Sequence, residues 1–129
     1  MNIPDNLLYT KDHEWAKLEG DKATMGITDF AQHSLGDITF IDLPKPSVKV
    51  KQAEWCATVE SVKAASDVYA PFSGEILEVN TELNSHPELA NKSPYESGWF
   101  AVIKISEASE KDKLMSPAKY KEYIEGLSK

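Results

Sequence analysis

The chain has 129 residues, of which 41% are apolar, and this length supports one domain with a substantial core but not two ordinary domains. Its formal net charge is −7, and lysine supplies all fourteen basic residues. The chain has no arginine, whose guanidinium group forms paired hydrogen bonds to phosphates and bases. Nucleic acid is therefore not expected as a partner. The single cysteine, Cys56, excludes an intramolecular disulfide and a cysteine-based zinc site.

The N-terminus and the hydropathy pattern indicate a bacterial cytoplasmic location. The first six residues show neither the basic start and apolar run of a secretory signal nor the pattern of a transit peptide. No apolar stretch approaches the roughly 20 residues that cross a bilayer. We therefore expect a monomer without membrane association, and a mature mitochondrial form is the alternative.

Alternation of apolar and polar residues predicts several strands. They are a hairpin within residues 13–28 with its turn at Gly20, and single strands over residues 38–43, 48–50, 55–60, 68–70, 74–80 and 99–105. Trp55, Ala57 and Val59 are expected to share one face of their strand. Residues 36–41 and 74–79 show a weak sequence similarity, which is consistent with two half-repeats that face one another.

Helical segments are expected to be few and short. Thr28 or Asp29 can cap a helix of about two turns, which ends at Gly36 because glycine takes positive φ freely. The polar segment 80–98 is expected to hold one short helical piece and a long loop. Ser116-Pro117 starts a C-terminal amphipathic helix, since proline is tolerated in the first turn. The apolar residues placed to share its face are Leu114 or Met115, Tyr120, Tyr123, Ile124 and Leu127.

The sequence contains no recognisable catalytic constellation. It lacks the Gly-x-Ser-x-Gly elbow, the Walker phosphate loop and the Gly-x-Gly-x-x-Gly fingerprint. His13, His33 and His86 lie far apart, and each lacks a second ligand at helical or hairpin spacing, so no metal site is expected. Cys56 lies in a predicted strand, where it is expected to fill space rather than act as a nucleophile.

Lys63 differs from the other lysines in its surroundings. It lies in a connection of small residues between two predicted strands, with Glu60 three positions before it and Asp67 four positions after it. A hairpin tip would hold this lysine clear of the body of the domain, where an enzyme could reach its amine. From the spacing alone, an ordinary solvated lysine on a turn remains the preferred interpretation.

The residues around Lys63 resemble a lipoyl-attachment motif, in which the central lysine receives lipoate in an amide bond. Biotin carriers flank their lysine with methionines, whereas Val62 and Ala64 stand here. The matching segments are Glu60-Ser61-Val62-Lys63-Ala64, Asp67-Val68, Ala70-Pro71 and Gly74-Glu75-Ile76, with further matches at His13-Glu14-Trp15, residues 26–32, Leu35-Gly36, Asn91, Pro94-Tyr95 and Gly98-Trp99. Over nearly its whole length, including the helix around Tyr120, the chain resembles the glycine cleavage H-protein family.

This resemblance implies a mainly β fold, the barrel-sandwich hybrid of lipoyl and biotinyl carriers, with short helices and a C-terminal helix. Residues 1–129 would form a single lipoyl-binding domain with an N-terminal extension and that helix. Two small sheets would be related by a pseudo-two-fold axis, and Lys63 would lie on a hairpin. The sequence departs from the family at Ser47, where glycine is usual, and over residues 51–56, which lack the usual Lys-Gly step. Both departures concern the shape of one hairpin.

The resemblance also implies a non-catalytic carrier whose cofactor is lipoate, attached covalently to Lys63. The lipoyl group would take up an aminomethyl group from glycine at a pyridoxal-dependent glycine decarboxylase (P protein). An aminomethyltransferase (T protein) would pass the carbon to tetrahydrofolate and free ammonia, and a dihydrolipoamide dehydrogenase (L protein) would reoxidise the dithiol. The carrier itself supplies position and a high effective concentration.

Two groups of further site residues follow from the resemblance. A lipoate ligase or lipoyl transferase would attach the cofactor. Its candidate recognition residues, which flank Lys63, are Glu60, Ser61, Val62 and Ala64. The loaded arm carries an amine that the family is thought to shelter in a surface cleft, and Glu14 and Asp67 are the candidates to pair with it. The alternative is that both are solvated surface acids.

Three other functions are compatible with the sequence. The same motif fits a lipoyl carrier that acts mainly as a lipoate relay to other lipoate-dependent enzymes. A plain interaction domain with an unmodified Lys63 is the second alternative, and an enzyme in its own right is the third. The mass of the intact protein separates modified from unmodified forms, and assays with the partner enzymes separate glycine cleavage from lipoate relay.

Overall fold

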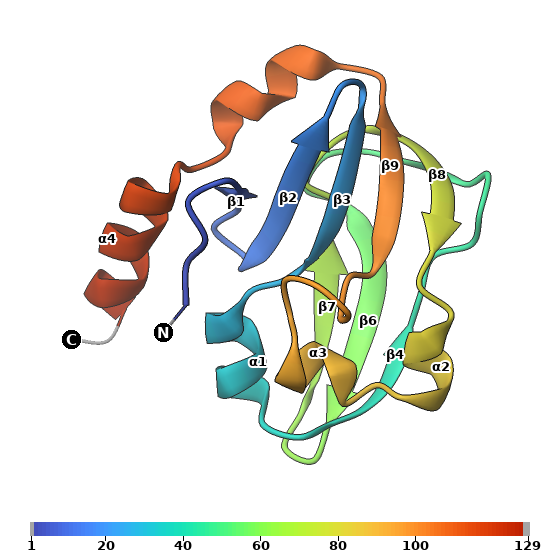
Figure 1. The fold of residues 1–129 in the computed structure, drawn as a ribbon, viewed down its shortest axis with the longest axis vertical. Helices are drawn as coiled ribbons and strands as arrows, with labels where there is room; N and C mark the ends of the chain where they lie inside the picture. The colour runs from blue at the N-terminus through green and yellow to red at the C-terminus, as the bar shows by residue number, and fades with distance from the viewer. Residues whose placement is uncertain (1, 128–129) are drawn as a thin grey trace.

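The computed structural model describes residues 2–127 and consists of two antiparallel sheets, one in front of the other in Figure 1. The larger sheet has the strand order β1-β2-β3-β9-β8-β5, and the smaller has the order β4-β6-β7. The strands are β1 Leu8–Tyr9, β2 Glu14–Glu19, β3 Lys22–Ile27, β4 Ile38–Asp42, β5 Lys49–Val50, β6 Trp55–Ser61, β7 Ala65–Tyr69, β8 Gly74–Val79 and β9 Ala101–Ile105. The predicted class, mainly β with short helices and a C-terminal helix, is confirmed.

Most of the predicted strands are present, although their ends differ. The hairpin of residues 13–28 is β2 and β3, with Gly20 at φ +64° in its turn. Strand β7 begins at Ala65 rather than Val68, so the hairpin that carries Lys63 has a shorter connection than the sequence pattern predicted. Strand β1 was missed because it has two residues, which is too short for any alternation to show.

The main core lies between the two sheets. Met25, Ile76 and Ile103 of the larger sheet are fully buried against Ile41 and Val59 of the smaller one. Each such side chain contributes about 1.5–3 kcal/mol when it leaves water, so this layer dominates the stability of the fold. The two similar segments, residues 36–41 and 74–79, lie in opposite sheets, since the first enters β4 and the second forms β8.

Four α-helices and one 3-10 helix complete the described part of the chain. They are α1 Asp29–Leu35, α2 Glu82–Ser85, α3 Leu89–Lys92, the 3-10 helix η1 Ala108–Lys113 and α4 Pro117–Leu127. Thr28 caps α1 by accepting a 3.2 Å hydrogen bond from Ala31 N, and Gly36 ends it at φ +76°. Residues 80–98 hold two short helices, where the sequence predicted one. Neither helix has a side-chain cap hydrogen bond: Thr81 stands at the N-cap of α2 but does not bond to it, and Glu88 before α3 is not a typical capping residue.

Helix α4 packs beside the N-terminal strand β1, as Figure 1 shows. The rings of Tyr9 and Tyr120 stack with centroids 4.6 Å apart. The Tyr120 hydroxyl lies 2.9 Å from His13 Nδ1 and 2.7 Å from Thr28 Oγ1. Leu127 is 51% exposed, so its predicted place on the apolar face is wrong: the last turn of α4 does not bury it.

Trp55 does not share the buried face that the alternating pattern predicted. Its side chain is 49% exposed, whereas Cys56 and Ala57 are buried. The register of β6 against β7 shifts between Trp55 and Ala57 and interrupts the alternation. Trp55 and Thr58 are thereby brought together, and the indole Nε1 donates a 2.8 Å hydrogen bond to Thr58 Oγ1.

The two departures from the family pattern coincide with unusual backbone geometry. Ser47 has φ +73° and Ala53 has φ +68°, a conformation that favours glycine. Both turns keep their hydrogen bonds, because Ser47 N donates to Ile76 O and Ala53 N donates to Ala70 O, each at 2.8 Å. The hairpin thus keeps its shape, and the side chains strain the backbone.

We expect Ala53→Gly and Ser47→Gly each to raise the free energy of unfolding by about 0.5–1 kcal/mol. Left-handed geometry costs an L-residue about 1–2 kcal/mol, and this relief exceeds the extra freedom of glycine in the unfolded chain. Urea unfolding of the variants measures the difference. Ala118→Gly in α4 is the control and should lower stability, since glycine is a poor helix former. Equal losses in all three variants would contradict the argument.

Candidate functional site

Lys63 lies at the tip of the β6–β7 hairpin, in a turn that the Ser61 side chain helps to close. Ser61 N donates to Ala64 O at 2.8 Å. The Ser61 hydroxyl oxygen accepts hydrogen bonds from the backbone amides of Lys63 and Ala64, both at 3.2 Å. A serine side chain therefore satisfies two amides that no strand partner reaches, and it gives the turn a defined shape.

A backbone hydrogen bond from Val62 joins this tip to the body of the domain, next to the pairing of Ser61 with Ile38. Val62 N donates to Asp37 O at 3.0 Å, and Asp37 belongs to the corner between α1 and β4. Asn91 of α3 holds that corner, since its side-chain amide donates to Gly36 O at 2.8 Å and its carbonyl accepts from Ile38 N at 2.9 Å. The sequence motif included Asn91 and Gly36 but gave no hint that they support the tip.

The side chain of Lys63 lies beside Gly36. A Cβ at Gly36 would come within 3.4 Å of Lys63 Cε, and the φ of +76° is also unfavourable for any other residue. Lys63 itself is exposed, and no ion pair involves its amine among residues 2–127. The amine is therefore accessible to an enzyme.

The four candidate recognition residues surround Lys63 but do not present the same surface. Val62 is 68% exposed, and Glu60 and Ala64 are exposed as well. Ser61 is half-buried, and its hydroxyl is engaged within the turn. Three of the four can meet an enzyme directly, whereas Ser61 shapes the turn that presents them.

Glu14 is buried, so its interpretation as a solvated surface acid is wrong. It is 1% exposed at the start of β2. Its carboxylate accepts hydrogen bonds from Thr10 Oγ1 at 2.5 Å and from Tyr69 N at 3.0 Å. Because β7 is an edge strand, the Tyr69 amide has no strand partner on this side, and the carboxylate takes that place. Burial raises the pKa of Glu14 to about 7, although both hydrogen bonds favour the charged form.

Glu14 lines a pocket of about 380 Å³ beside the end of β7. Tyr69, Ala53, Lys113 and Met115 are among its other walls. Asp67 does not line it: this residue is exposed on β7, where its carboxylate accepts a weak 3.4 Å hydrogen bond from Thr58 Oγ1. The structure therefore places the two candidate acids in different surroundings.

Strand β7 nevertheless leads from Lys63 to both acids. Asp67 follows Lys63 by four residues, which is about 13 Å in an extended strand at roughly 3.3 Å per residue. Tyr69, whose amide binds Glu14, lies two residues further. From its Cα to the nearer sulfur, a lipoyl-lysine arm has about twelve bonds of roughly 1.5 Å, each of which advances it by about 1.25 Å, so it spans about 15 Å when extended. Its end would reach the level of Asp67 and approach that of Glu14.

Other features of the described residues offer no competing centre. No group of His, Cys, Asp and Glu side chains within residues 2–127 could hold a metal ion. Burial raises the pKa of the Cys56 thiol to about 12, which leaves it protonated and unreactive. No helix in this part of the chain is long and apolar enough to span a membrane.

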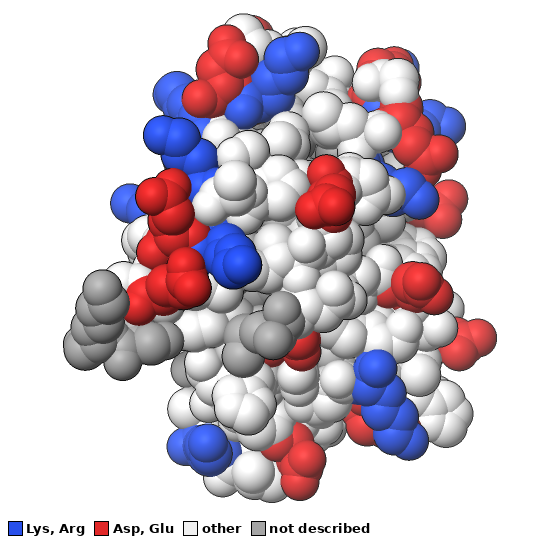
Figure 2. Space-filling view, turned by 60° about the vertical axis from the view of Figure 1, so that its left-hand side comes forward, with Lys and Arg blue, Asp and Glu red and all other residues white. Residues whose placement is uncertain are grey.

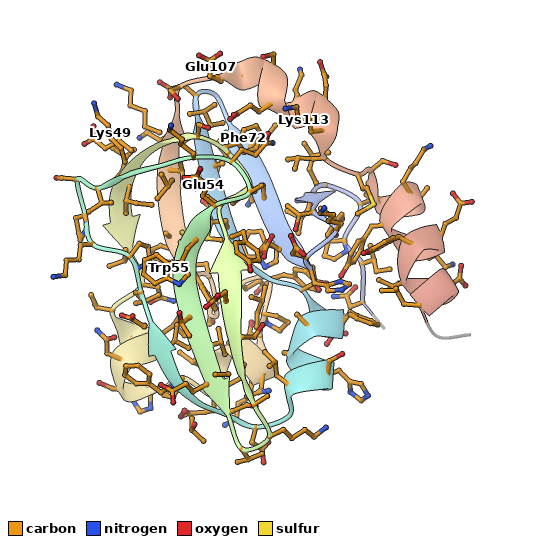
Figure 3. The ribbon with its side chains drawn as sticks, turned by 180° about the vertical axis from the view of Figure 1, so that it is seen from behind. Lys49, Glu54, Trp55, Phe72, Glu107 and Lys113 are labelled. Atoms are coloured by element: carbon orange, nitrogen blue, oxygen red, sulfur yellow. The ribbon has the colours of Figure 1, made fainter. Side chains whose placement is uncertain are left out.

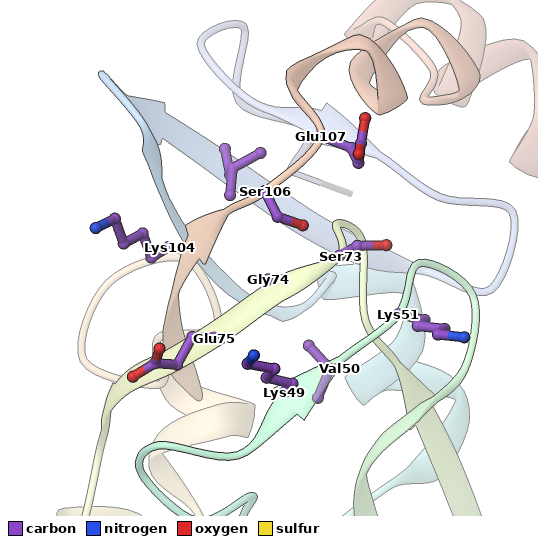
Figure 4. Close-up of a pocket in the computed structure, with 10 residues that line it drawn as sticks. Lys49, Val50, Lys51, Ser73, Gly74, Glu75, Lys104, Ser106 and Glu107 are labelled. Atoms are coloured by element: carbon purple, nitrogen blue, oxygen red, sulfur yellow. The ribbon is translucent and has the colours of Figure 1, made fainter.

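A groove of about 640 Å³ lies between β5, β8 and β9. Figure 4 shows Lys49, Lys51 and Lys104 along it, and none of the predicted site residues lines it.

Comparison with known proteins gives consistent matches over nearly the whole chain. A family model described as "Glycine cleavage H-protein" matches residues 7–126. The glycine cleavage system H protein of Halothermothrix orenii is 53% identical over 97% of this chain and 98% of its own, and that of Bacillus subtilis is 49% identical over 95% and 96%. The crystal structure of a glycine cleavage system H protein from Mycobacterium marinum has a TM-score of 0.85 and 34% identity, and covers 98% of this chain and 100% of its own.

The buried carboxyl of Glu14 predicts a loss of stability as the pH rises. Its folded pKa of about 7 lies above its ordinary value of 4.5, so its contribution is complete below pH 4.5 and is lost as the pH rises through 7. The loss should be about 3 kcal/mol. We expect Glu14→Gln, which keeps the acceptor for Tyr69 N, to remove this slope and to be more stable than the parent at pH 8. Urea unfolding at several pH values between 4.5 and 8 tests this, and equal slopes in both proteins would refute it.

Proposed function

Because the chain belongs to the glycine cleavage H-protein family, we propose that it is a lipoyl carrier that takes the aminomethyl group of glycine from the pyridoxal-dependent decarboxylase to the aminomethyltransferase on lipoylated Lys63. The observation that carries this proposal is the exposed, unpaired Lys63 amine at a hairpin tip that is hydrogen-bonded to the scaffold. A dihydrolipoamide dehydrogenase would complete the cycle. Relatives from bacteria are consistent with a bacterial cytoplasmic location.

The residues around Lys63 fit a lipoyl group. The amine is accessible, and the small side chains of Ala64 and Ala65 leave room on one side of it. On the other side lies Gly36, which has no side chain to occupy the space next to Lys63. When bound, the lipoyl group supplies the disulfide and dithiol chemistry that the chain lacks. The chain supplies presentation, because the fixed turn holds the root of the arm in one place while the arm itself remains free to move.

In this proposal Glu14 and Asp67 interact with the cargo, the aminomethyl group carried by the lipoyl arm, and take no part in the attachment of lipoate to Lys63. An aminomethyl group carries an ammonium when protonated, and a carboxylate within reach stabilises that charge. Asp67 offers an exposed carboxylate at about the length of the arm, whereas Glu14 offers a desolvated one at the end of β7. An ammonium that approaches Glu14 favours its ionised form, so arrival of the cargo would drive release of a proton from this carboxyl. Sheltered in this way, the cargo would be protected from water between enzymes.

Lipoylation should occur at Lys63 and at none of the other thirteen lysines. All fourteen lysines carry the same primary amine, so intrinsic reactivity cannot select one of them and presentation has to do so. The test incubates the chain with a bacterial lipoate ligase, lipoate and ATP, followed by peptide mapping. Exchange of neighbours (Val62→Lys with Lys63→Val) should reduce or abolish labelling, because the amine leaves its place beside Gly36.

The control for this test is Lys63→Arg, which should remain unlabelled while its free energy of unfolding changes by less than about 0.5 kcal/mol. Lipoate found mainly on another lysine, or undiminished labelling of the exchanged variant, would disprove the assignment of Lys63. An apo chain that decarboxylates glycine without partner enzymes would disprove the carrier role.

Removal of either acid should expose the cargo to water. We expect Glu14→Gln and Asp67→Asn, each lipoylated and loaded by the decarboxylase with glycine, to release the carried amine about 2- to 5-fold faster than the parent. The effect is modest because a partly exposed ion pair contributes about 0.5–1 kcal/mol. Colorimetric detection of ammonia over time gives the rate. Glu78→Gln, which removes an exposed carboxylate outside this path on β8, is the control, and parental rates in both test variants would remove these residues from the cleft.

A further inference from the structure

The outer face of the three-stranded sheet, formed by β4, β6 and β7, exposes an unusual set of apolar side chains. Figure 3 views the molecule from this side and labels Trp55. Phe40 on β4 and Trp55 on β6 are each 49% exposed, and Val62 at the tip is 68% exposed. Isolated apolar residues on a surface are ordinary, but two aromatic residues on this sheet, together with Val62 next to the lysine that must enter an enzyme, indicate an interaction surface.

The charges on this face all have the same sign. Asp42, Glu60 and Asp67 are exposed there, and none of the three strands contains a lysine. On the side of α4, in contrast, Figure 2 shows lysine and acidic side chains interspersed. An acidic surface with aromatic side chains complements a partner surface that carries lysine or arginine around apolar pockets.

The length of the unmodified Lys63 side chain indicates which partner enzyme must make the most extensive contact with the outer face of the sheet. The amine of an unmodified lysine extends only about 6 Å from its Cα, compared with about 15 Å for the lipoylated arm. An enzyme that acts on the unmodified amine has to bring its reaction centre within a few ångströms of the hairpin tip, so its surface must press against the domain. Enzymes that act at the end of the arm meet it further away.

We propose that the outer face of the β4-β6-β7 sheet is the docking surface for the enzyme that attaches lipoate, with Phe40 and Trp55 as apolar anchors and Asp42 and Asp67 facing basic residues of that enzyme. This proposal rests on the proposed attachment of lipoate to Lys63. It extends the contact beyond the residues that flank the lysine in sequence.

The dimensions of the face suit such an interface. A standard interface covers about 800 Å² on each partner, which corresponds to a disc with a radius of about 16 Å. Phe40 pairs with Glu60 close to the tip. Trp55 pairs with Tyr69, which lies six residues from Lys63, or about 20 Å along the strand. The hydrogen bond from its indole to Thr58 turns the ring back toward the tip, so a footprint about 32 Å across, centred between Trp55 and the tip, covers both.

The test compares ligation kinetics of full-length apo variants with a bacterial lipoate ligase. Phe40→Ser and Trp55→Ser, made separately, should raise KM for the apo chain about 5- to 30-fold while kcat stays within about 2-fold, as expected when an anchor is lost but the amine is unchanged. Leu77→Ser on β8 is the matched control, an exposed aliphatic residue of the other sheet, and should leave both constants unchanged. Asp42→Lys should raise KM as well, and it also tests the surface if an aromatic variant fails to fold.

Each outcome bears on the proposal separately from the attachment itself. Parental KM values in all three face variants, with the parent modified on Lys63, would overturn the docking surface and leave the attachment site intact. Normal ligation combined with slower turnover of lipoylated variants by the decarboxylase or the aminomethyltransferase would assign the face to another partner and overturn the choice of enzyme. Absence of any modification in the parent would overturn the proposed function and this proposal with it.

Discussion

The 3.0 Å hydrogen bond from Val62 N to Asp37 O is the link on which the presentation of Lys63 depends. The end of a strand pair frays readily, and although β4 pairs with β6 as far as Ser61, each further backbone bond contributes only about 0.5–1.5 kcal/mol. The bond is effective because its acceptor is itself fixed. Gly36 turns the chain out of α1, and the Asn91 side chain holds the corner on both sides of Asp37. Elements distant in sequence thus hold a lysine at a set place without touching its amine.

The buried position of Glu14 has two opposite effects on the stability of the fold. Its carboxylate replaces a missing strand partner for Tyr69 N and so joins the larger sheet to the edge of the smaller one. The same burial raises its pKa to about 7, which makes the charged form costly near neutral pH. A neutral acceptor such as a glutamine side-chain amide would bind the Tyr69 amide without this cost. A carboxyl kept in such a position is better explained by a second role for its charge, and the pocket beside it offers space for a cation.

Local signals in the sequence predicted much of the fold, and they failed where tertiary contacts override them. The β2–β3 hairpin, the Thr28 cap and the start of α4 follow from alternation, a capping residue and a proline, all of which act over a few residues. The exposure of Trp55 depends on a register shift against β7, which no period-2 pattern contains. The burial of Glu14 depends on an edge strand 55 residues away, so the sequence marked the residue but not its surroundings. The motif around Lys63 identified the tip, whereas its support by Asn91 is visible only in the structure.

A carrier that serves several enzymes must also leave each of them, and the surface around Lys63 is consistent with this requirement. Its aromatic side chains are half-exposed rather than set in a deep groove, so each adds contact area without a large buried core. Its carboxylates are solvated, and their attraction to a basic partner speeds encounter more than it slows release. The groove between β5, β8 and β9 holds three lysines beside Glu75 and Glu107, whereas β4, β6 and β7 contain no lysine, so the outer face of the three-stranded sheet is the more acidic of the two surfaces. A basic partner therefore meets the acidic face in preference to the lysine-lined groove, and this orientation brings the hairpin tip toward it.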